Sequence, residues 1–393
     1  MEINTDQQKI KYILDRNVEE VISKESLEAK LSSGKSIRVK LGIDPTSPFI
    51  HIGRAVLLWK LKSFQELGHK VILIVGDFTG LVGDTSDKDS ERPMLSEKQA
   101  EANMKTYFRQ TFKILDSSKT ETHYNSEWLK KLGFKEVSRL ADLFSLHEFS
   151  ARDVINRRLK EGKRVSLREV LYPLMQGYDS VAVRADIEIG GTDQRFNLLA
   201  GRVIQPAYKQ KAQDILMTSL LEGTDGRKMS SSFGNVINIT DSPNEICGKV
   251  MSVRDDLIEK YYKLATNLGE DKITENMRKG GLESKQILAF EIVKLYHSES
   301  KAIAALKFFR ETFQEKKLPS DIETFIFKKG TAINHIIHIS GASRSASAAR
   351  TLIRQRAVEL DQKIIIDPSF KPEALGILRI GKKKFLKIIP EGK

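Results

Sequence analysis

Residues 38–54 bring histidine, arginine and aspartate to a predicted turn between a strand and a helix. Residues 38–43 are predicted to form a short buried strand, which the prolines that follow bring to an end. A helix is predicted to begin near His51, because leucines recur there at helical spacing. Free N–H groups at a helix start favour a phosphate, His51 and Arg54 would add donors, and Gly53 leaves room for a ligand. Taken alone, the stretch could also be a capped surface helix.

A second segment with phosphate chemistry lies at residues 226–234. This glycine-bounded loop places Lys228 and Met229 directly before three consecutive serines. A loop of this kind can close over a polyphosphate and supply positive charge only when the ligand is bound. The two segments together predict a polyphosphate site.

Three polar residues recur along a helix that is predicted from residue 167. Tyr172, Gln176 and Asp179 stand at positions i, i+4 and i+7, so they share one face of an otherwise apolar helix. Polar groups on a buried face need partners, which are either a ligand or one another and the backbone. We favour a ligand for the three together.

Paired glycines at 190 and 191 follow a strand predicted over residues 181–189. Asp193 comes next, so the backbone has room for a ribose and a carboxylate can accept from its hydroxyl groups. Residues 214–221 are predicted to form a last strand before the serine loop.

An open α/β sheet is the predicted frame for these groups. Residues 71–75 are a continuous apolar run, typical of a parallel strand buried on both faces. Strand, helix and strand in succession predict a right-handed crossover, and ligands of such sheets lie outside the carboxyl ends of the strands. Residues 6–31, 93–168 and 242–318 are predicted to be helical, and residues 319–330 to be a connector.

The charge of the chain points to an anionic partner. The net charge is +13 and the isoelectric point is near 9.4, which favours nucleic acid first and a membrane surface second. Residues 331–393 carry twelve Lys or Arg against five Asp or Glu, and a compact basic module of this kind suits phosphate contacts.

The compartment is predicted from what the sequence lacks. Cys247 is the single cysteine, which fits a reducing compartment. The first residues do not have the pattern of a signal peptide, and no apolar run is long enough to cross a bilayer. No Cys/His cluster has the spacing of metal ligands. We therefore expect a cytoplasmic protein without a metal site of its own.

The segments His-Ile-Gly-Arg (51–54) and Lys-Met-Ser-Ser-Ser (228–232) resemble the two signatures of class I aminoacyl-tRNA synthetases. The usual signatures have His where this chain has Arg54, and a second Lys where it has Ser231. With Tyr172, Gln176, Asp179 and Gly-Gly-Thr-Asp-Gln (190–194), nearly the whole chain resembles the tyrosyl-tRNA synthetases of bacteria. The resemblance implies a Rossmann-like parallel-sheet catalytic domain (1–235, with a helical insertion at about 93–168), an all-α anticodon-binding domain (236–320) and a small α+β S4-like RNA-binding domain (331–393).

The resemblance also implies a role for each site residue. Tyr172, Gln176 and Asp84 would hold the ammonium group of tyrosine, Asp179 its phenol hydroxyl and Gln194 its carboxyl region. The second phenol partner of many relatives corresponds to Lys40. The adenylate and phosphates would be bound by Gly42, Asp44, Thr46, His51, Gly53, Arg54, Lys88, Arg92, Gly191, Asp193, Lys228, Met229 and Ser231. RNA contacts would come from Arg344, Arg350, Arg354, Lys382 and Lys383, while Arg356 replaces the usual glycine of the S4 fold.

The implied reaction joins L-tyrosine to ATP and then transfers the tyrosyl group to the 3′ end of tRNA-Tyr. Mg²⁺ would be carried by the ATP phosphates, and a homodimer would form through the insertion. Two other readings of the same motifs remain. One is a small-molecule nucleotidyltransferase with the His-x-Gly signature, and the other is an RNA-binding protein that has lost amino-acid activation. Tyrosine-dependent ATP–pyrophosphate exchange distinguishes the three functions, because only a tyrosyl-tRNA synthetase is expected to catalyse it.

Overall fold

The computed structural model describes residues 3–84, 97–314, 322–361, 363–381 and 384–391. The chain divides into two compact units, Met1–Leu306 and Lys307–Lys393, which are considered separately below. None of the described helices is both long and apolar enough to cross a membrane.

The first unit is built around a six-stranded mixed α/β sheet with the strand order β1-β6-β5-β2-β3-β4. Neighbouring strands from β6 to β4 are parallel, and β1 is antiparallel to β6 at one edge. The strands are β1 (Val18–Ile22), β2 (Arg38–Ile43), β3 (Lys70–Val75), β4 (Thr120–Tyr124), β5 (Ile187–Gly191) and β6 (Asp214–Thr218).

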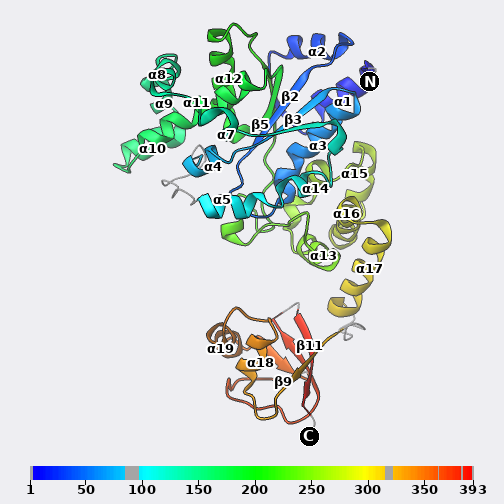
Figure 1. Ribbon diagram of the computed structural model, residues 1–393. Helices are drawn as coiled ribbons and strands as arrows, with labels where there is room; N and C mark the ends of the chain where they lie inside the picture. The colour runs from blue at the N-terminus through cyan, green and yellow to red at the C-terminus, as the bar shows by residue number, and fades with distance from the viewer. Residues whose placement is uncertain (1–2, 85–96, 315–321, 362, 382–383, 392–393) are drawn as a thin grey trace. The chain divides into compact units, whose positions relative to one another are not determined.

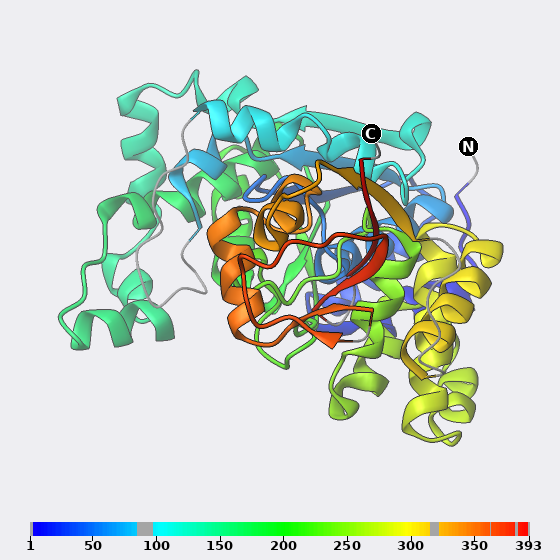
Figure 2. The same cartoon turned by 90° about the horizontal axis from the view of Figure 1, so that it is seen from below.

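Helices cover both faces of this sheet (Figure 1). The helices up to β5 are α1 (Gln7–Asp15), α2 (Lys24–Ser32), α3 (Ile52–Glu66), α4 (Thr79–Val82), α5 (Glu97–Met104), α6 (Tyr107–Thr111), α7 (Ser126–Leu129), α8 (Phe134–Asp142), α9 (Leu146–Ser150), α10 (Asp153–Lys160) and α11 (Leu167–Ala182). Those that follow are α12 (Arg195–Ala207), α13 (Pro243–Met251), α14 (Ile258–Ala265), α15 (Glu270–Met277), α16 (Gly281–Tyr296) and α17 (Glu299–Phe309). In two views, α8–α10 lie on one side of the unit and α15 and α16 on the other (Figures 1 and 2).

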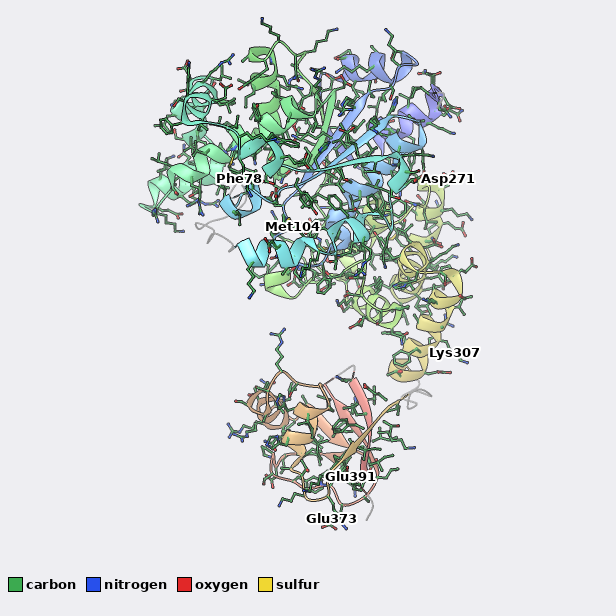
Figure 3. All side chains as sticks on the ribbon, in the orientation of Figure 1. Phe78, Met104, Asp271, Lys307, Glu373 and Glu391 are labelled. Atoms are coloured by element: carbon green, nitrogen blue, oxygen red, sulfur yellow. The ribbon has the colours of Figure 1, made fainter. Side chains whose placement is uncertain are left out.

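The strand order explains where a ligand can bind. From β2 the chain proceeds to β3 on one side, and from β5 it proceeds to β6 on the other, so β2 and β5 flank the point where the order reverses. Loops diverge there at the carboxyl ends of the strands and leave a crevice. The turn after β3 that contains Phe78 lies at this end (Figure 3).

The second unit is a five-stranded sheet, ordered β7-β11-β10-β8-β9, packed against two helices. Its elements are β7 (Glu323–Phe327), α18 (Ile333–Ile339), α19 (Ala346–Arg354), β8 (Val358–Leu360), β9 (Lys363–Ile364), β10 (Gly376–Ile380) and β11 (Lys384–Pro390). Arg356, just after α19, has a φ of +55°, a left-handed conformation that costs a side-chain-bearing residue energy and suits glycine.

The predicted α/β architecture is confirmed, with differences at its edges. β1 lies inside a stretch that was expected to be helical, β4 inside the predicted helical insertion and β7 inside the predicted connector. All three are outer strands of their sheets and half-exposed, so they lack the apolar runs that identify central strands. The strand expected from residue 181 begins only at Ile187, because α11 continues to Ala182.

Candidate active site

A cavity of about 500 Å³ lies in the first unit at the carboxyl ends of β2, β3, β5 and β6. It brings together sixteen residues that were predicted from separate stretches of sequence. They are Gly42, Asp44, Thr46, His51, Gly53, Arg54, Asp84, Tyr172, Gln176, Asp179, Gly191, Asp193, Gln194, Lys228, Met229 and Ser231.

A buried carboxylate, Asp179 on α11, marks one end of the cavity. Its Oδ1 accepts a 2.7 Å hydrogen bond from Trp128 Nε1, and its Oδ2 accepts a 3.3 Å bond from Asn125 Nδ2. Burial raises the pKa of Asp179 to about 7, against the opposing effects of Lys40 and these two donors. Asp179 thus titrates near neutral pH and, when ionised, can accept a hydrogen bond from a hydroxyl group of a ligand.

Polar groups next to Asp179 form a connected chain. Asn125 Nδ2 donates to Thr79 Oγ1 at 2.8 Å, and Thr79 Oγ1 donates to Asp44 Oδ1 at 2.7 Å. Tyr172 donates its hydroxyl to Asp44 Oδ2 at 2.9 Å, and burial raises its pKa well above the usual value. Tyr172 is therefore a neutral donor that orients Asp44.

His51 lies at the opposite end, as the N-cap of α3. Its Nδ1 accepts from the backbone N–H of Arg54 at 3.3 Å, so the ring proton must be on Nε2. Loss of water around the ring, then the charges of Arg54 and Lys228, lower the pKa of His51 to about 3. The imidazole is therefore neutral at pH 7 and offers one N–H to an anion.

The guanidinium of Arg54 points inward from the first turn of α3. Nη2 donates to Thr46 Oγ1 at 2.6 Å, and Nη1 donates to Asp44 O at 3.2 Å and to the Tyr107 hydroxyl at 2.5 Å. Arg54 therefore belongs to the wall of the cavity beside His51.

The serine loop closes this end of the cavity. Lys228 Nζ lies 2.9 Å from Asp193 Oδ2, with 41% and 24% of the two side chains exposed. Ser231 Oγ donates to Ser47 Oγ at 3.3 Å, across to the turn after β2. Gly53 packs closely beneath Met229, because a Cβ there would lie 3.1 Å from Met229 Sδ and the methionine side chain would have to shift slightly. The loop and the start of α3 thus lie together in one part of the cavity wall, which carries the side chains of His51, Arg54 and Lys228.

Eight predicted site residues are absent from the cavity lining, four of them described and four outside the described residues. Lys40 is fully buried below it and pairs with Glu188, so it does not line the cavity as expected of a substrate-binding residue. Arg344, Arg350 and Arg354 belong to the second unit, Arg350 and Arg354 on α19. Lys88, Arg92, Lys382 and Lys383 lie outside the described residues, so nothing is added to the predictions for them.

Three residues of the hydrogen-bond network around Asp179 were not predicted from the sequence: Thr79, Asn125 and Trp128. Asn125 and Trp128 follow β4, a polar edge strand without an apolar run to reveal it. Asn125 is fixed by its Oδ1, which accepts from Phe78 N at 3.0 Å, and its backbone N–H, which donates to Val75 O. A recognised strand at residues 120–124 would have placed Asn125 at the cavity and Trp128 beside Asp179.

Comparisons with known proteins agree with this geometry. The family model described as tRNA synthetases class I (W and Y) matches residues 32–314. The tyrosine–tRNA ligase of Thermotoga maritima is 43% identical over 385 residues, covering 96% of each chain. That of Moorella thermoacetica is 44% identical over 390 residues, covering 96% of this chain and 94% of the relative.

Solved structures share the fold at lower identity. A C-terminally truncated mitochondrial tyrosyl-tRNA synthetase of Aspergillus nidulans aligns with a TM-score of 0.64 at 22% identity, over 78% of this chain and 94% of the other. The Archaeoglobus fulgidus tyrosyl-tRNA synthetase, solved with L-tyrosine, aligns with a TM-score of 0.60 at 22% identity. The alignment covers 76% of this chain and 99% of the other.

Sheet, cavity and both signature segments define a class I aminoacyl-tRNA synthetase. Within that class, the relatives that match almost from end to end are tyrosine–tRNA ligases. The chain belongs to the tyrosine–tRNA ligase family.

Proposed function

We propose that the chain activates L-tyrosine with ATP in the cavity of the first unit and then transfers the tyrosyl group to tRNA-Tyr. The observation that carries the proposal is the arrangement of one cavity: a buried carboxylate at one end, and a neutral imidazole with two cations at the other. The phenol hydroxyl group of tyrosine matches the end with the buried carboxylate. The negative charge of the ATP phosphates matches the end with the imidazole and the two cations.

Tyrosine would lie with its phenol hydroxyl on Asp179 and its ammonium group near Tyr172, Gln176 and Asp84. Asp179, which is 3% exposed, would accept a hydrogen bond from this hydroxyl group. Phenylalanine would leave this carboxylate desolvated and without its partner, and this enzyme class is the known example of such discrimination. Asn125 and Trp128 hold the carboxylate in place.

Activation needs no nucleophile from the protein, because the carboxylate of tyrosine attacks the α-phosphate of ATP. The protein must hold the two in line and stabilise negative charge on the leaving pyrophosphate. Neutral His51 donates through Nε2, and Arg54 and Lys228 add positive charge, with Lys88 and Arg92 as further cations. Gly42, Asp44, Gly191 and Asp193 would hold the adenylate, Gln194 the tyrosine carboxyl region, and Thr46 the γ-phosphate.

Mg²⁺ is proposed to arrive on the ATP phosphates as part of the substrate. Among the described residues no group of three or more His, Cys, Asp or Glu could hold a metal ion. Mg²⁺ prefers phosphate and water oxygens and keeps much of its hydration shell. It would neutralise phosphate charge beside Arg54 and Lys228.

tRNA is proposed to contact three parts of the chain. The 3′ end would reach the adenylate in the catalytic domain (1–235), the anticodon the helical domain (236–320), and another part of the tRNA the S4-like domain (331–393). Support comes from α13–α17, which follow one another in the second part, and from Arg344, Arg350 and Arg354, which are all exposed in the third.

A cytoplasmic homodimer is the proposed assembly. Exposed large apolar side chains gather on the insertion and the start of α11: Phe134 (87%), Leu146 (68%), Leu159 (50%) and Leu167 (80%). Such side chains on one segment favour burial against a second copy.

ATP–pyrophosphate exchange with each of the twenty amino acids tests the function. We expect exchange with tyrosine and none above background with phenylalanine or tryptophan. Charging of tRNA-Tyr is then measured with radiolabelled tyrosine. Absence of exchange with tyrosine, or equal exchange with tryptophan, would contradict the proposal.

A further inference from the structure

A buried ion pair lies directly below the tyrosine end of the cavity. Lys40 on β2 and Glu188 on β5 are partners across the parallel ladder, so their side chains leave the same face of the sheet. Lys40 Nζ lies 2.9 Å from Glu188 Oε1, and the two side chains are 0% and 1% exposed. The pair faces α11, which carries Gln176 and Asp179.

The pair is part of a closed hydrogen-bond network. Besides Glu188, the Lys40 ammonium donates to Gln176 O at 2.9 Å and to Ser180 Oγ at 2.8 Å, which uses all three of its N–H groups. Glu188 Oε1 also accepts from Gln176 Nε2 at 3.1 Å, and Oε2 accepts from Ser180 Oγ at 3.2 Å and from Gln213 Nε2 at 2.5 Å. Lys40 therefore has no N–H group left to donate to a substrate.

The network fixes which way the Gln176 amide points. An ionised Glu188 only accepts hydrogen bonds, so it must face the NH₂ group of Gln176 and would repel the amide oxygen. Because Gln176 also lines the cavity, its amide oxygen is directed to the cavity side. An acceptor in that place suits an ammonium group.

We propose that Lys40 and Glu188 are a positioning pair, which holds the Gln176 amide oxygen toward the ammonium group of the amino-acid substrate. This inference rests on the proposed function and assigns Lys40 a role beneath the site in place of the phenol contact. Lys40 also fastens the Gln176 carbonyl, and so α11, to the sheet. Neither residue touches the substrate.

Replacing both Lys40 and Glu188 distinguishes a role in positioning Gln176 from a role in the stability of the fold. A single loss leaves one buried charge without a partner, whereas an apolar replacement of both is often tolerated. We therefore choose Lys40→Met/Glu188→Met, which also leaves the net charge around Asp179 unchanged. In this variant Gln176 Nε2 has lost its acceptor, so the amide can rotate.

Two unreactive ligands report on the ammonium group. Tyrosinol carries the phenol and the ammonium group, and 3-(4-hydroxyphenyl)propan-1-ol carries the phenol alone. Affinities are measured by calorimetry on the full chain at pH 8.5, above the pKa of about 7 that Asp179 has in the unaltered chain. We expect the double variant to bind tyrosinol about tenfold more weakly or worse, as for the loss of a hydrogen bond to a charged group. The affinity for the alcohol without nitrogen should stay within about twofold.

Lys60→Met is the matched control, since Lys60 is also a buried lysine and donates to Ile13 O and Arg16 O away from the cavity. It should lower the melting temperature and leave both affinities unchanged. If the double variant does not fold, Lys40→Met/Glu188→Gln replaces it, which leaves no buried charge unpaired and keeps an amide beside Ser180 and Gln213, with the same expected selectivity and a smaller loss. Equal weakening of both ligands, or unchanged tyrosinol binding, would overturn the inference. Failure of tyrosine-dependent exchange in the unaltered chain would instead overturn the proposed function.

Discussion

The two ends of the cavity are built on different principles. At the tyrosine end, Asp179 and Gln176 are buried on α11 and each has partners that fix its direction. At the phosphate end, Lys228 and Ser231 lie on an exposed loop, and Lys228 pairs with Asp193, a residue that is itself predicted to bind ligand. One end is fixed before the substrate arrives, and the other can exchange partners.

The difference follows from what each end must do. A single hydroxyl group is recognised only if its acceptor in the protein is desolvated and rigid. In a wet site, a water molecule would donate to the acceptor equally well when the hydroxyl group is missing. Charge that develops on a leaving pyrophosphate is met best by cations that come close as the bond breaks. The predictions below act on one end at a time.

His51→Ala should have the largest effect and should be confined to the phosphate end. Loss of one donor to the transition state slows reactions by about 10²–10³-fold. Stopped-flow measurement should show tyrosyl-adenylate formation slowed by that factor, with the Kd for tyrosine unchanged. A matching loss of tyrosine affinity would mean that His51 only caps α3.

Asp179→Asn should act on the tyrosine end alone. A hydrogen bond to a charged group contributes about 1.5–3 kcal/mol, so kcat/KM for tyrosine should fall about 10–100-fold. The KM for ATP should not change in pyrophosphate exchange. A comparable rise in the KM for ATP would show that the two ends are not independent.

The pH dependence of tyrosine binding tests the same carboxylate. Burial raises the pKa of Asp179 from 3.8 to about 7, so its contribution to the stability of the ligand-free chain is lost as pH rises toward 7. Tyrosine affinity should change in the opposite sense, falling up to tenfold per pH unit below about 7 and levelling off above it. Asp179→Asn should abolish this dependence.

A second group that titrates near this end must be controlled. His123, with its pKa raised by hydrogen bonds to Glu121 and Glu127 despite partial burial, packs edge-on against Trp128. His123→Gln should keep the pH dependence of tyrosine affinity. If it abolished the dependence while Asp179→Asn kept it, the titrating group would be His123.

Central strands and signature segments were predictable from the sequence, because their physical signals are local. The residues of β3 are an apolar run, and Tyr172, Gln176 and Asp179 show their shared face through spacing alone. The edge strands β1, β4 and β7 were not predictable, since their residues alternate weakly and their pairing partners are distant in sequence.

Lys40 shows the limit of reading a site by position. Its place in β2 was correct, but whether its ammonium faces a ligand or a carboxylate depends on Glu188, almost 150 residues later in the chain. Asn125 and Trp128 show the same limit, because only the pairing of β4 with β3 brings them to Asp179. Contacts between distant segments leave no pattern within either one.

Deleting residues 331–393 should leave both ends of the cavity intact. Tyrosine-dependent exchange should stay within about twofold, while charging of tRNA becomes weaker and the salt dependence of RNA binding less steep, since phosphate contacts are lost. Filter binding at several salt concentrations measures this. Unchanged tRNA affinity in the shortened chain would contradict an RNA-binding role for this region.

We expect the phosphate end to rely on Arg54, because Ser231 stands where a second lysine is usual. A charge-assisted hydrogen bond is about twice as strong as a neutral one, so Arg54→Ala should slow adenylate formation more than Ser231→Ala, by about tenfold against a few-fold. The inward guanidinium beside Thr46 supports this order.

The most direct measurement is the pre-steady-state rate of tyrosyl-adenylate formation in Arg54→Ala, Ser231→Lys and the double variant. Both positions line the same cavity, so if both act on the phosphates a lysine at 231 should restore part of the rate that Arg54→Ala removes, and the two effects should not be additive. A harmless Arg54→Ala, or strictly additive effects, would show that Arg54 does not compensate for Ser231 at the phosphates.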